Sequence, residues 1–238
     1  MNQSATLPVA PIISNLEGFS QIADLSAKMK PYRFSGINLD MRQMTWCDGN
    51  MCAPLGAVLY HAGRNLNELS LTHIPSDVES LLCKNGFLTH YGRAKRTDTY
   101  GSTIQYHRFE PEDDRVFSYF IDEQFRNKAI PEMSRALHKK FLEALMEIFS
   151  NAVLHSEKKR GPIPGGLGLK LLREFIQKNH GRLTVVSDKG YWEQHPDGNL
   201  EMTRMINPFP GTVVNIEINT SDQKTYVLST EQVDEIPF

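Results

Sequence analysis

The sequence predicts a mixed α/β fold of the α+β sandwich type, built as two domains. Apolar residues make up 40% of the 238 residues and charged residues 23%, which is typical of a globular chain. The length divided by about 150 gives between one and two domains. Segments with helical periodicity alternate with short strand-like segments, and this order indicates layers of helices and sheet.

The charge balance excludes several classes of partner. Lys and Arg total 26 and Asp and Glu total 28, which gives a net charge of −2. We therefore expect neither nucleic acid nor an anionic membrane surface as a partner. No apolar run approaches the roughly 18 residues of a membrane helix. Three cysteines are an odd and sparse set, which favours a reducing compartment and a cytoplasmic location.

The first half of the chain alternates helices and strands. Apolar residues spaced by three or four predict a helix over residues 15–30. Asp48 or Asn50 is expected to cap the next helix, and Ser76 the one after it. Cys47 and Cys52 flank a helix start, which favours small buried side chains over zinc ligands. The other elements predicted in this half are helices over residues 50–64 and 77–84 and strands over residues 37–41 and 69–74.

The second half starts after a soft boundary between residues 90 and 130. We expect Arg93 and Arg96 to lie in a solvated loop there. A long amphipathic helix is predicted over residues 131–156, and Gly181 is expected to close the helix after the glycine-rich turn. The other predicted elements are strands over residues 102–108, 116–121, 182–187 and 211–219, the helix over residues 169–179 and a turn at residues 188–190.

Three polar residues form a row along one edge of the long helix. Glu147, Asn151 and His155 are spaced i, i+4 and i+8, so they lie on one side of the helix next to its buried face. A carboxylate, an amide and an imidazole in such a row could serve a binding site. Three polar residues on the solvent side of an amphipathic helix would give the same pattern, and they are the more common case.

A glycine cluster opens the next helix. Gly165, Gly166 and Gly168 are followed by Lys170, and backbone N–H groups at a helix start can approach an anion. Lys170 could add a point charge near a phosphate. A flexible turn before a helix is the alternative. The spacing matches neither the P-loop nor the dinucleotide-binding fingerprint.

Together these blocks resemble the GHKL ATP-binding fold, which histidine kinases, gyrase and anti-sigma serine kinases share. Residues 147–156 resemble its N-box, residues 165–175 its second glycine box and helix, residues 180–187 the following strand, and residues 209–218 its terminal Gly-Thr strand. The resemblance covers residues 140–219 in the family order. It implies that the chain contains a histidine-kinase-like ATPase module.

The resemblance implies a role for each matching position. Asn151 would hold Mg²⁺ against the phosphates of ATP, and Glu147 would polarise the attacking group in a catalytic member. The backbone of Gly165, Gly166 and Gly168 would cradle phosphate. Thr212 would lie near the adenine. ATP and Mg²⁺ are the cofactors that this resemblance implies.

The chain departs from the family pattern between the N-box and the glycine box. The family has a strand, an Asp-x-Gly-x-Gly adenine loop and a phosphate lid there, whereas residues 156–164 are only nine positions long and contain no Asp. Asp188 follows a strand, but it lies on the wrong side of the glycine box. The carboxylate that specifies adenine and the lid are therefore missing from the sequence.

Residues 36–87 resemble a STAS domain, the fold of anti-sigma antagonists and of sulfate-transporter tails. The resemblance rests on the strand at residues 37–41, the turn and helix that begin at Trp46, and the strand and helix that follow. Phospho-switching members carry a serine after the Asp of this turn, but here Asp48 is followed by Gly49. A serine-phosphorylation switch is therefore not expected.

Two hypotheses follow for the function. The first is a cytoplasmic regulator in signalling or partner switching, with a STAS-like domain over residues 1–125, an incomplete GHKL module over residues 126–222 and a tail over residues 223–238. Its partners would be other regulatory proteins or a second copy of the chain. If active, it would be a Mg²⁺-dependent ATPase or kinase. The second is a degenerate module that binds no nucleotide and serves as a protein-binding scaffold.

Overall fold

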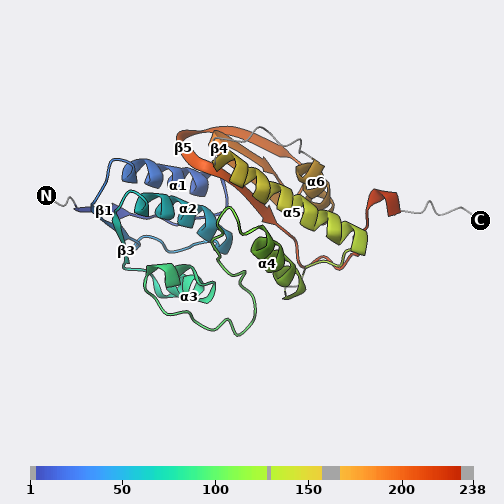
Figure 1. The fold of residues 1–238 in the computed structure, drawn as a ribbon, viewed down its shortest axis with the longest axis horizontal. Helices are drawn as coiled ribbons and strands as arrows, with labels where there is room; N and C mark the ends of the chain where they lie inside the picture. The colour runs from blue at the N-terminus through green and yellow to red at the C-terminus, as the bar shows by residue number, and fades with distance from the viewer. Residues whose placement is uncertain (1–3, 128–129, 157–166, 232–238) are drawn as a thin grey trace, which may run out of the picture. The chain divides into compact units, whose positions relative to one another are not determined.

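The computed structural model describes residues 4–127, 130–156 and 167–231, and at residues 127, 153–156, 167 and 229 only the backbone. It confirms the mixed α/β class, with one parallel three-stranded sheet and one antiparallel sheet (Figure 1). The chain forms two compact units. Unit 1 comprises Met1–Arg108, Val185–Trp192 and Met202–Val213, and unit 2 comprises Phe109–Thr184, Glu193–Glu201 and Val214–Phe238. The domain boundaries drawn from the sequence stay a prediction.

Unit 1 begins with two β-α-β crossovers. The strands are β1 (Ser4–Pro8), β2 (Gly36–Asp40) and β3 (Glu68–Thr72), parallel and in the order β1-β2-β3. Helices α1 (Leu16–Met29) and α2 (Cys52–Gly63) connect them. Right-handed crossovers in this strand order place both helices on the same face of the sheet, and α1 does pack against α2.

The pleat of β2 separates an apolar face from a polar one. Ile37 and Leu39 are buried, whereas Asn38 points to the opposite face. The Asn38 Oδ1 atom accepts hydrogen bonds from the hydroxyls of Ser70 at 3.1 Å and Thr72 at 3.0 Å. Hydrogen bonds between side chains thus join β2 to β3 on the polar face.

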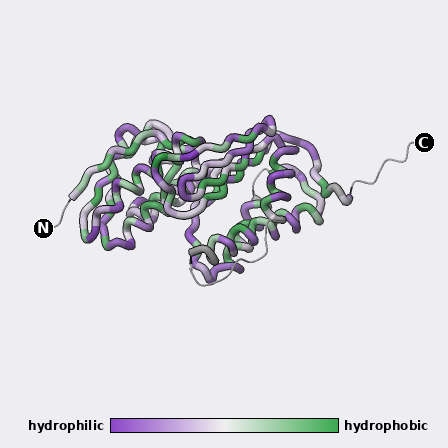
Figure 2. Tube along the Cα trace, turned by 90° about the horizontal axis from the view of Figure 1, so that it is seen from above, coloured by the Kyte–Doolittle hydropathy of each residue, from purple (hydrophilic) through white to green (hydrophobic). Residues whose placement is uncertain are grey.

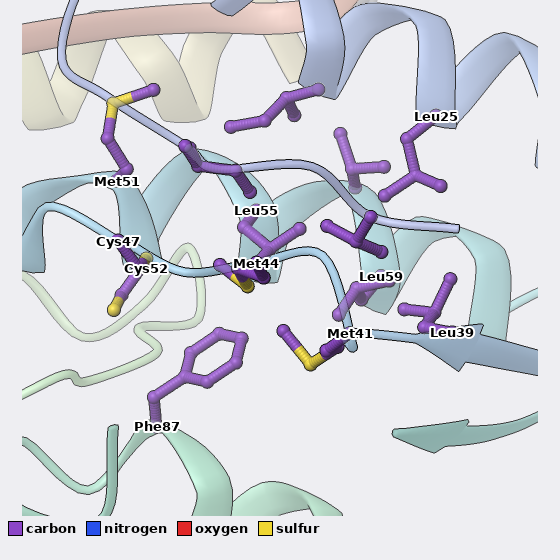
Figure 3. Close-up of a cluster of buried hydrophobic side chains, with 14 of the residues drawn as sticks. Leu25, Leu39, Met41, Met44, Cys47, Met51, Cys52, Leu55, Leu59 and Phe87 are labelled. Carbon is purple, nitrogen blue, oxygen red and sulfur yellow. The ribbon is translucent and has the colours of Figure 1, made fainter. Parts of the chain in front are cut away.

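The core of unit 1 is rich in sulfur. Cys47, Cys52 and Met51 lie beside Leu55 and Phe87 in this core (Figure 3). All three cysteines of the chain are buried free thiols, as the sequence predicts for Cys47 and Cys52. Strands from late in the sequence also enter this core, through Val186, Tyr191, Met205 and Phe209.

The helix caps in unit 1 differ from the expected ones. Asp48 and Ser76 make no capping hydrogen bond to the helices that follow. The carboxylate of Asp48 instead accepts hydrogen bonds from the backbone N–H of Ser14 at 2.7 Å and from the Trp46 indole at 2.8 Å. A carboxylate at a helix start can serve another loop equally well, so the residue type alone did not identify its partner. Unit 1 also contains α3 (Ser76–Lys84) and the short helices η1 (Gly49–Met51) and η2 (Phe87–Tyr91).

In the described part of unit 2, one α-helix contacts two others. Both α4 (Asp114–Asn127) and α6 (Leu167–Asn179) pack against α5 (Arg135–Ser156). Phenylalanine rings fill the contacts: Phe117 on α4 stacks on Phe149 of α5 with a centroid distance of 4.4 Å. The strand predicted over residues 116–121 is wrong, because that apolar run belongs to α4. Residues 102–108 likewise form no strand.

The second sheet joins β4 (Arg182–Gln194) and β5 (Leu200–Glu217). The Thr184 hydroxyl lies 3.5 Å from the Glu193 carboxylate, although nine residues of extended strand would span about 30 Å. The chain of β4 therefore reverses between them, and Asp188 adopts the left-handed conformation that such a turn requires, with φ 49°. This agrees with the predicted turn at residues 188–190.

The end of α6 shows a second left-handed residue. His180, with φ 53°, makes the turn that was expected of Gly181. Gly181 has another reason to be glycine, because a Cβ atom there would overlap the backbone carbonyl oxygen of Glu217 on β5. The glycine thus permits close packing of the chain at the start of β4.

The residues after β5 close unit 2. Tyr226 is buried, forms a parallel bridge with Met133 and donates a hydrogen bond from its hydroxyl to Asp222. The backbone N–H of Ser134 donates to the Tyr226 carbonyl at 2.7 Å. A short helix η3 (Ser229–Glu231) follows. Figure 2 colours the chain by hydropathy, and hydrophilic and hydrophobic residues intermingle along its helices, as in amphipathic helices.

Across the part of the chain that the structure describes, no helix is both long enough and apolar enough to cross a bilayer.

Candidate functional site

Helices α5 and α6 line a hollow in unit 2 that contains several residues predicted from the sequence. Its volume is about 480 Å³. The charged residues of its wall come from α5 and α6. The glycine at the start of α6 also forms part of the wall. The wall includes Lys140, Glu143, Glu147, Gly168, Lys170 and Glu174.

Glu147 and Gly168 make the central contact of this hollow. The backbone N–H of Gly168 donates a hydrogen bond to Glu147 Oε2 at 3.0 Å. Gly168 is the second residue of α6, where backbone N–H groups have no partner within the helix. The carboxylate of α5 therefore caps α6 and lies at its positive end, where negative charge is stabilised.

Gly168 is required by packing at this contact. A Cβ atom at this position would lie 2.7 Å from Glu147 Oε2 and 3.0 Å from Ala144 Cα. Both distances are shorter than ordinary van der Waals contacts, so a side chain here would push α6 away from α5. The glycine thus brings the start of α6 to the row of polar residues on α5.

The charges in the hollow pair with one another. Lys140 Nζ lies 2.7 Å from Glu143, and its hydrogen bond lowers the pKa of that carboxyl. Lys170 is exposed, and its Nζ atom lies 4.0 Å from Glu174. The wall therefore carries two lysines and three glutamates, counting Glu147. The excess of carboxylates favours a cation over a bare phosphate in this hollow.

The structure places the predicted site residues in different ways. Glu147, Gly168 and Lys170 lie together in the wall of the hollow. Asn151 follows Glu147 by about one turn on α5 and is half-buried. Thr212 belongs to unit 1, where its hydroxyl lies 2.9 Å from that of Ser187 on β4. Gly165, Gly166, most of residues 156–164 and the side chain of His155 lie outside the described residues.

The side chains of the hollow fit magnesium in complex with phosphate. In the wall, Glu147 offers a carboxylate oxygen, a ligand type that Mg²⁺ prefers, and Lys170 offers a cation to a phosphate oxygen. Asn151 offers an amide oxygen about one turn further along α5, outside the wall. No three His, Cys, Asp or Glu side chains in the described ranges gather as a metal site. A magnesium ion here would therefore need oxygens from a bound ligand as well as those of the protein.

Three charged residues of the wall were not predicted from the sequence. Lys140 and Glu143 precede Glu147 by seven and four residues, which places them on the same side of α5. Glu174 stands four residues after Lys170 on α6. Extending each polar row by one or two helical turns would have identified all three.

Comparisons of the chain with protein-family models, with curated proteins and with solved structures found no match.

Proposed function

We propose that this chain is a cytoplasmic regulatory protein that binds a magnesium nucleotide through its phosphates in the hollow between α5 and α6. The observation that carries the proposal is the convergence of Glu147, Gly168 and Lys170 on one hollow. The GHKL resemblance implies a phosphate-binding role for Gly168 and, in a catalytic member, a role for Glu147 in polarising the attacking group. These two residues are hydrogen-bonded to each other, so they are direct neighbours in the structure.

Each residue has a distinct part in this proposal. The amide oxygen of Asn151 and the carboxylate of Glu147 would hold Mg²⁺, which would offset the excess of carboxylates in the wall. Lys170 would contact a phosphate oxygen. In a hydrolytic reaction Glu147 would be the residue that orients and polarises water. The bound ion would make the phosphate chain more electrophilic by neutralising its charge.

The STAS resemblance adds a protein partner to this proposal. Unit 1 would bind other regulatory proteins, or a second copy of the chain, and nucleotide binding in unit 2 would control that contact. A serine-phosphorylation switch is not part of the proposal. The carboxylate of Asp48, next to Gly49, is already bonded to Ser14 and Trp46.

A second function, a scaffold that binds no nucleotide, is favoured by one specific observation. Glu147 already accepts the N–H of Gly168 at the helix start, which is the group that a phosphate would otherwise receive. The nine residues 156–164 also contain no Asp to recognise adenine. In this alternative α5 and α6 would serve only to hold unit 2 together.

Titration calorimetry with Mg²⁺-ADP and Mg²⁺-ATP distinguishes the two functions. We expect saturable binding that is lost on adding EDTA and in Asn151→Ala, and weakened in Lys170→Ala. Lys139→Ala is the matched control, because Lys139 is an exposed lysine on α5 outside the wall of the hollow. No heat at millimolar nucleotide would favour the scaffold. ATP hydrolysis that disappears in Glu147→Ala would exclude it.

A further inference from the structure

A guanidinium group in unit 1 is surrounded by tyrosines. Arg108 Nε donates a hydrogen bond to the Tyr106 hydroxyl at 2.9 Å, and Nη2 donates to the Tyr91 hydroxyl at 3.3 Å. The Arg108 Cζ atom also lies 5.3 Å from the ring centroid of Tyr60. Three segments supply this cluster: α2, η2 and the irregular chain at residues 105–108.

The cluster is held in place by packing. The backbone N–H of Tyr106 donates to the Asn85 carbonyl at 2.7 Å. Its ring packs edge-on against Phe87 at 5.1 Å and against His90 at 5.3 Å. A Cβ atom at Gly56 of α2 would overlap the Tyr106 hydroxyl, so glycine there makes room for it. These contacts fix the position of the hydroxyl to which Arg108 donates.

No carboxylate pairs with Arg108 among the described residues: its neighbours in the structure are the tyrosines. Residues 49–67, 80–97 and 99–109, from which the cluster is built, contain no Asp or Glu, and the acidic residues that border them are Asp48, Glu68, Glu79, Asp98 and Glu110. Glu79 lies just outside these segments and pairs with Arg93 and Arg96. The Arg and Lys residues in the acid-free segments are Arg64, Lys84, Arg93, Lys95, Arg96 and Arg108.

The cluster has more hydrogen-bond donors than acceptors. Each tyrosine oxygen accepts a bond from Arg108, which leaves its O–H available to donate. Burial raises the pKa of Tyr91 to about 12, so this hydroxyl keeps its proton at neutral pH. Burial lowers the pKa of His90, and the charges of Arg108 and His107 lower it further. The local field is therefore positive.

The cluster is accessible from solvent. Arg108, Tyr91 and Tyr106 are half-buried and Tyr60 is 45% exposed, so each residue of the cluster keeps some contact with solvent. Partly desolvated guanidinium groups bind phosphate oxygens more strongly than fully hydrated ones, because charge-assisted hydrogen bonds gain strength where water is excluded.

We propose that Arg108, Tyr91 and Tyr106 form a binding site for a phosphate dianion. The guanidinium supplies the charge, the two phenol hydroxyls donate hydrogen bonds, and Tyr60 forms an apolar wall. The ligand is free phosphate or a phosphoryl group carried on a serine side chain, which share this chemistry. This site has no residue in common with the hollow between α5 and α6, and it does not depend on the nucleotide proposal.

The direct test follows the Nε–H resonance of Arg108 by ¹H–¹⁵N NMR during titration with inorganic phosphate and, separately, with O-phosphoserine. We expect a saturable shift of this resonance and an increase in the pKa of His90. Tighter binding of O-phosphoserine would identify a protein-borne phosphoryl group, and tighter binding of inorganic phosphate would identify the free ion. The proposal would be overturned if the Arg108 resonance did not move when the ligand is at millimolar concentration and in 50-fold excess over the protein.

Variants separate a binding site from a structural clamp. Tyr91→Phe keeps the ring and removes one hydroxyl, and we expect about tenfold weaker phosphate binding with little change in thermal unfolding. Arg108→Lys keeps the positive charge but removes the planar set of N–H donors of the guanidinium, and phosphate binding should weaken by a similar factor. Arg64→Gln is the control, because it removes one exposed charge from the same acid-free segments. Equal weakening in Arg64→Gln and Tyr91→Phe would show that only the general field attracts phosphate, and it would contradict the proposal.

Discussion

The carboxylate of Glu147 on α5 accepts the backbone N–H of Gly168 at the start of α6, at 3.0 Å. These residues are 21 positions apart in the sequence, and the bond aligns the polar row of α5 with the glycine-rich start of α6. The GHKL resemblance implies that the same carboxylate polarises the attacking group at a nucleotide site. One side chain thus has a measurable role in stability and a proposed role in binding.

The capping role predicts a loss of stability in Glu147→Gln. The amide still accepts a hydrogen bond, but it loses the charge that interacts with the end of the helix. We expect the free energy of unfolding in urea to fall by about 1 kcal/mol. Glu143→Gln, at an exposed carboxylate in the same wall, should change it by less than about 0.5 kcal/mol. Equal losses in the two variants would argue against a cap.

The packing role of Gly168 predicts opposite effects for two glycine-to-alanine substitutions. Gly168→Ala places a methyl group against Ala144 and Glu147, and we expect a loss of about 1–3 kcal/mol of stability. Gly63→Ala, in α2, places its methyl group 4.0 Å from Leu69 Cδ1. Gly63→Ala should stabilise the protein by up to about 1 kcal/mol because alanine favours the helix. Thermal unfolding of both variants tests this, and a stabilising Gly168→Ala would contradict it.

Asp222 predicts a dependence of stability on pH. Hydrogen bonds from the Tyr226 hydroxyl and the Lys224 backbone N–H lower the pKa of Asp222. A lowered folded-state pKa means that this carboxylate stabilises the fold above its unfolded pKa of about 3.9, and that the contribution is lost as the pH falls through the folded-state pKa. Asp222→Asn should therefore unfold at a lower temperature than the wild type at pH 7, and the difference should shrink below pH 4. The exposed Asp188 provides the control Asp188→Asn, for which a matching pH profile would refute this explanation.

The buried thiols predict slow chemical modification. Cys47, Cys52 and Cys83 are each no more than 3% exposed, and the hydrogen bond with Cys52, together with burial, raises the pKa of Cys47. We expect Ellman's reagent to react with none of the three within minutes in buffer and with all three in 6 M guanidinium chloride. Rapid reaction of any thiol in the native protein would show that this core opens more readily than its burial implies.

Periodicity predicted most of the helices and strands. The spacing of Phe19 and Ile22 gave α1, and the alternation around Leu39 gave β2, because in both cases one face is buried and the other is polar. The strand β1 was not predicted, since Ser4–Pro8 has a weak pattern of its own and gains its conformation by pairing with β2. The sequence of Ser4–Pro8 alone does not indicate that this segment pairs with β2.

Helix α4 shows how packing decides an ambiguous segment. The run from Val116 to Ile121 is apolar enough for a buried strand, and a strand was predicted. In the structure Phe117 and Phe120 are three residues apart and both contact Phe109, while Phe117 also stacks on Phe149. Only a helix brings both rings to the same side, and the partner rings lie elsewhere in the sequence.

The candidate site was predicted in part. The row spacing pointed to Glu147, and the glycine cluster pointed to Gly168 and Lys170, which all line the hollow, because these patterns are local to one helix or one turn. The role predicted for Asn151 stays a prediction. The contact between Glu147 and Gly168 depends on how α5 packs against α6. The spacing of residues along the sequence does not predict this packing. The Arg108 cluster was not predicted, since its tyrosines come from three segments with no common motif.

The most direct test of the nucleotide proposal is the amide resonance of Gly168. In a ¹H–¹⁵N NMR titration with ADP and Mg²⁺, we expect saturable shifts of the Gly168 and Lys170 amides that disappear when EDTA removes the magnesium. The amide of Gly49, in unit 1, should not move. Unchanged Gly168 and Lys170 amides at millimolar Mg²⁺-ADP would contradict the account and leave the scaffold function in its place.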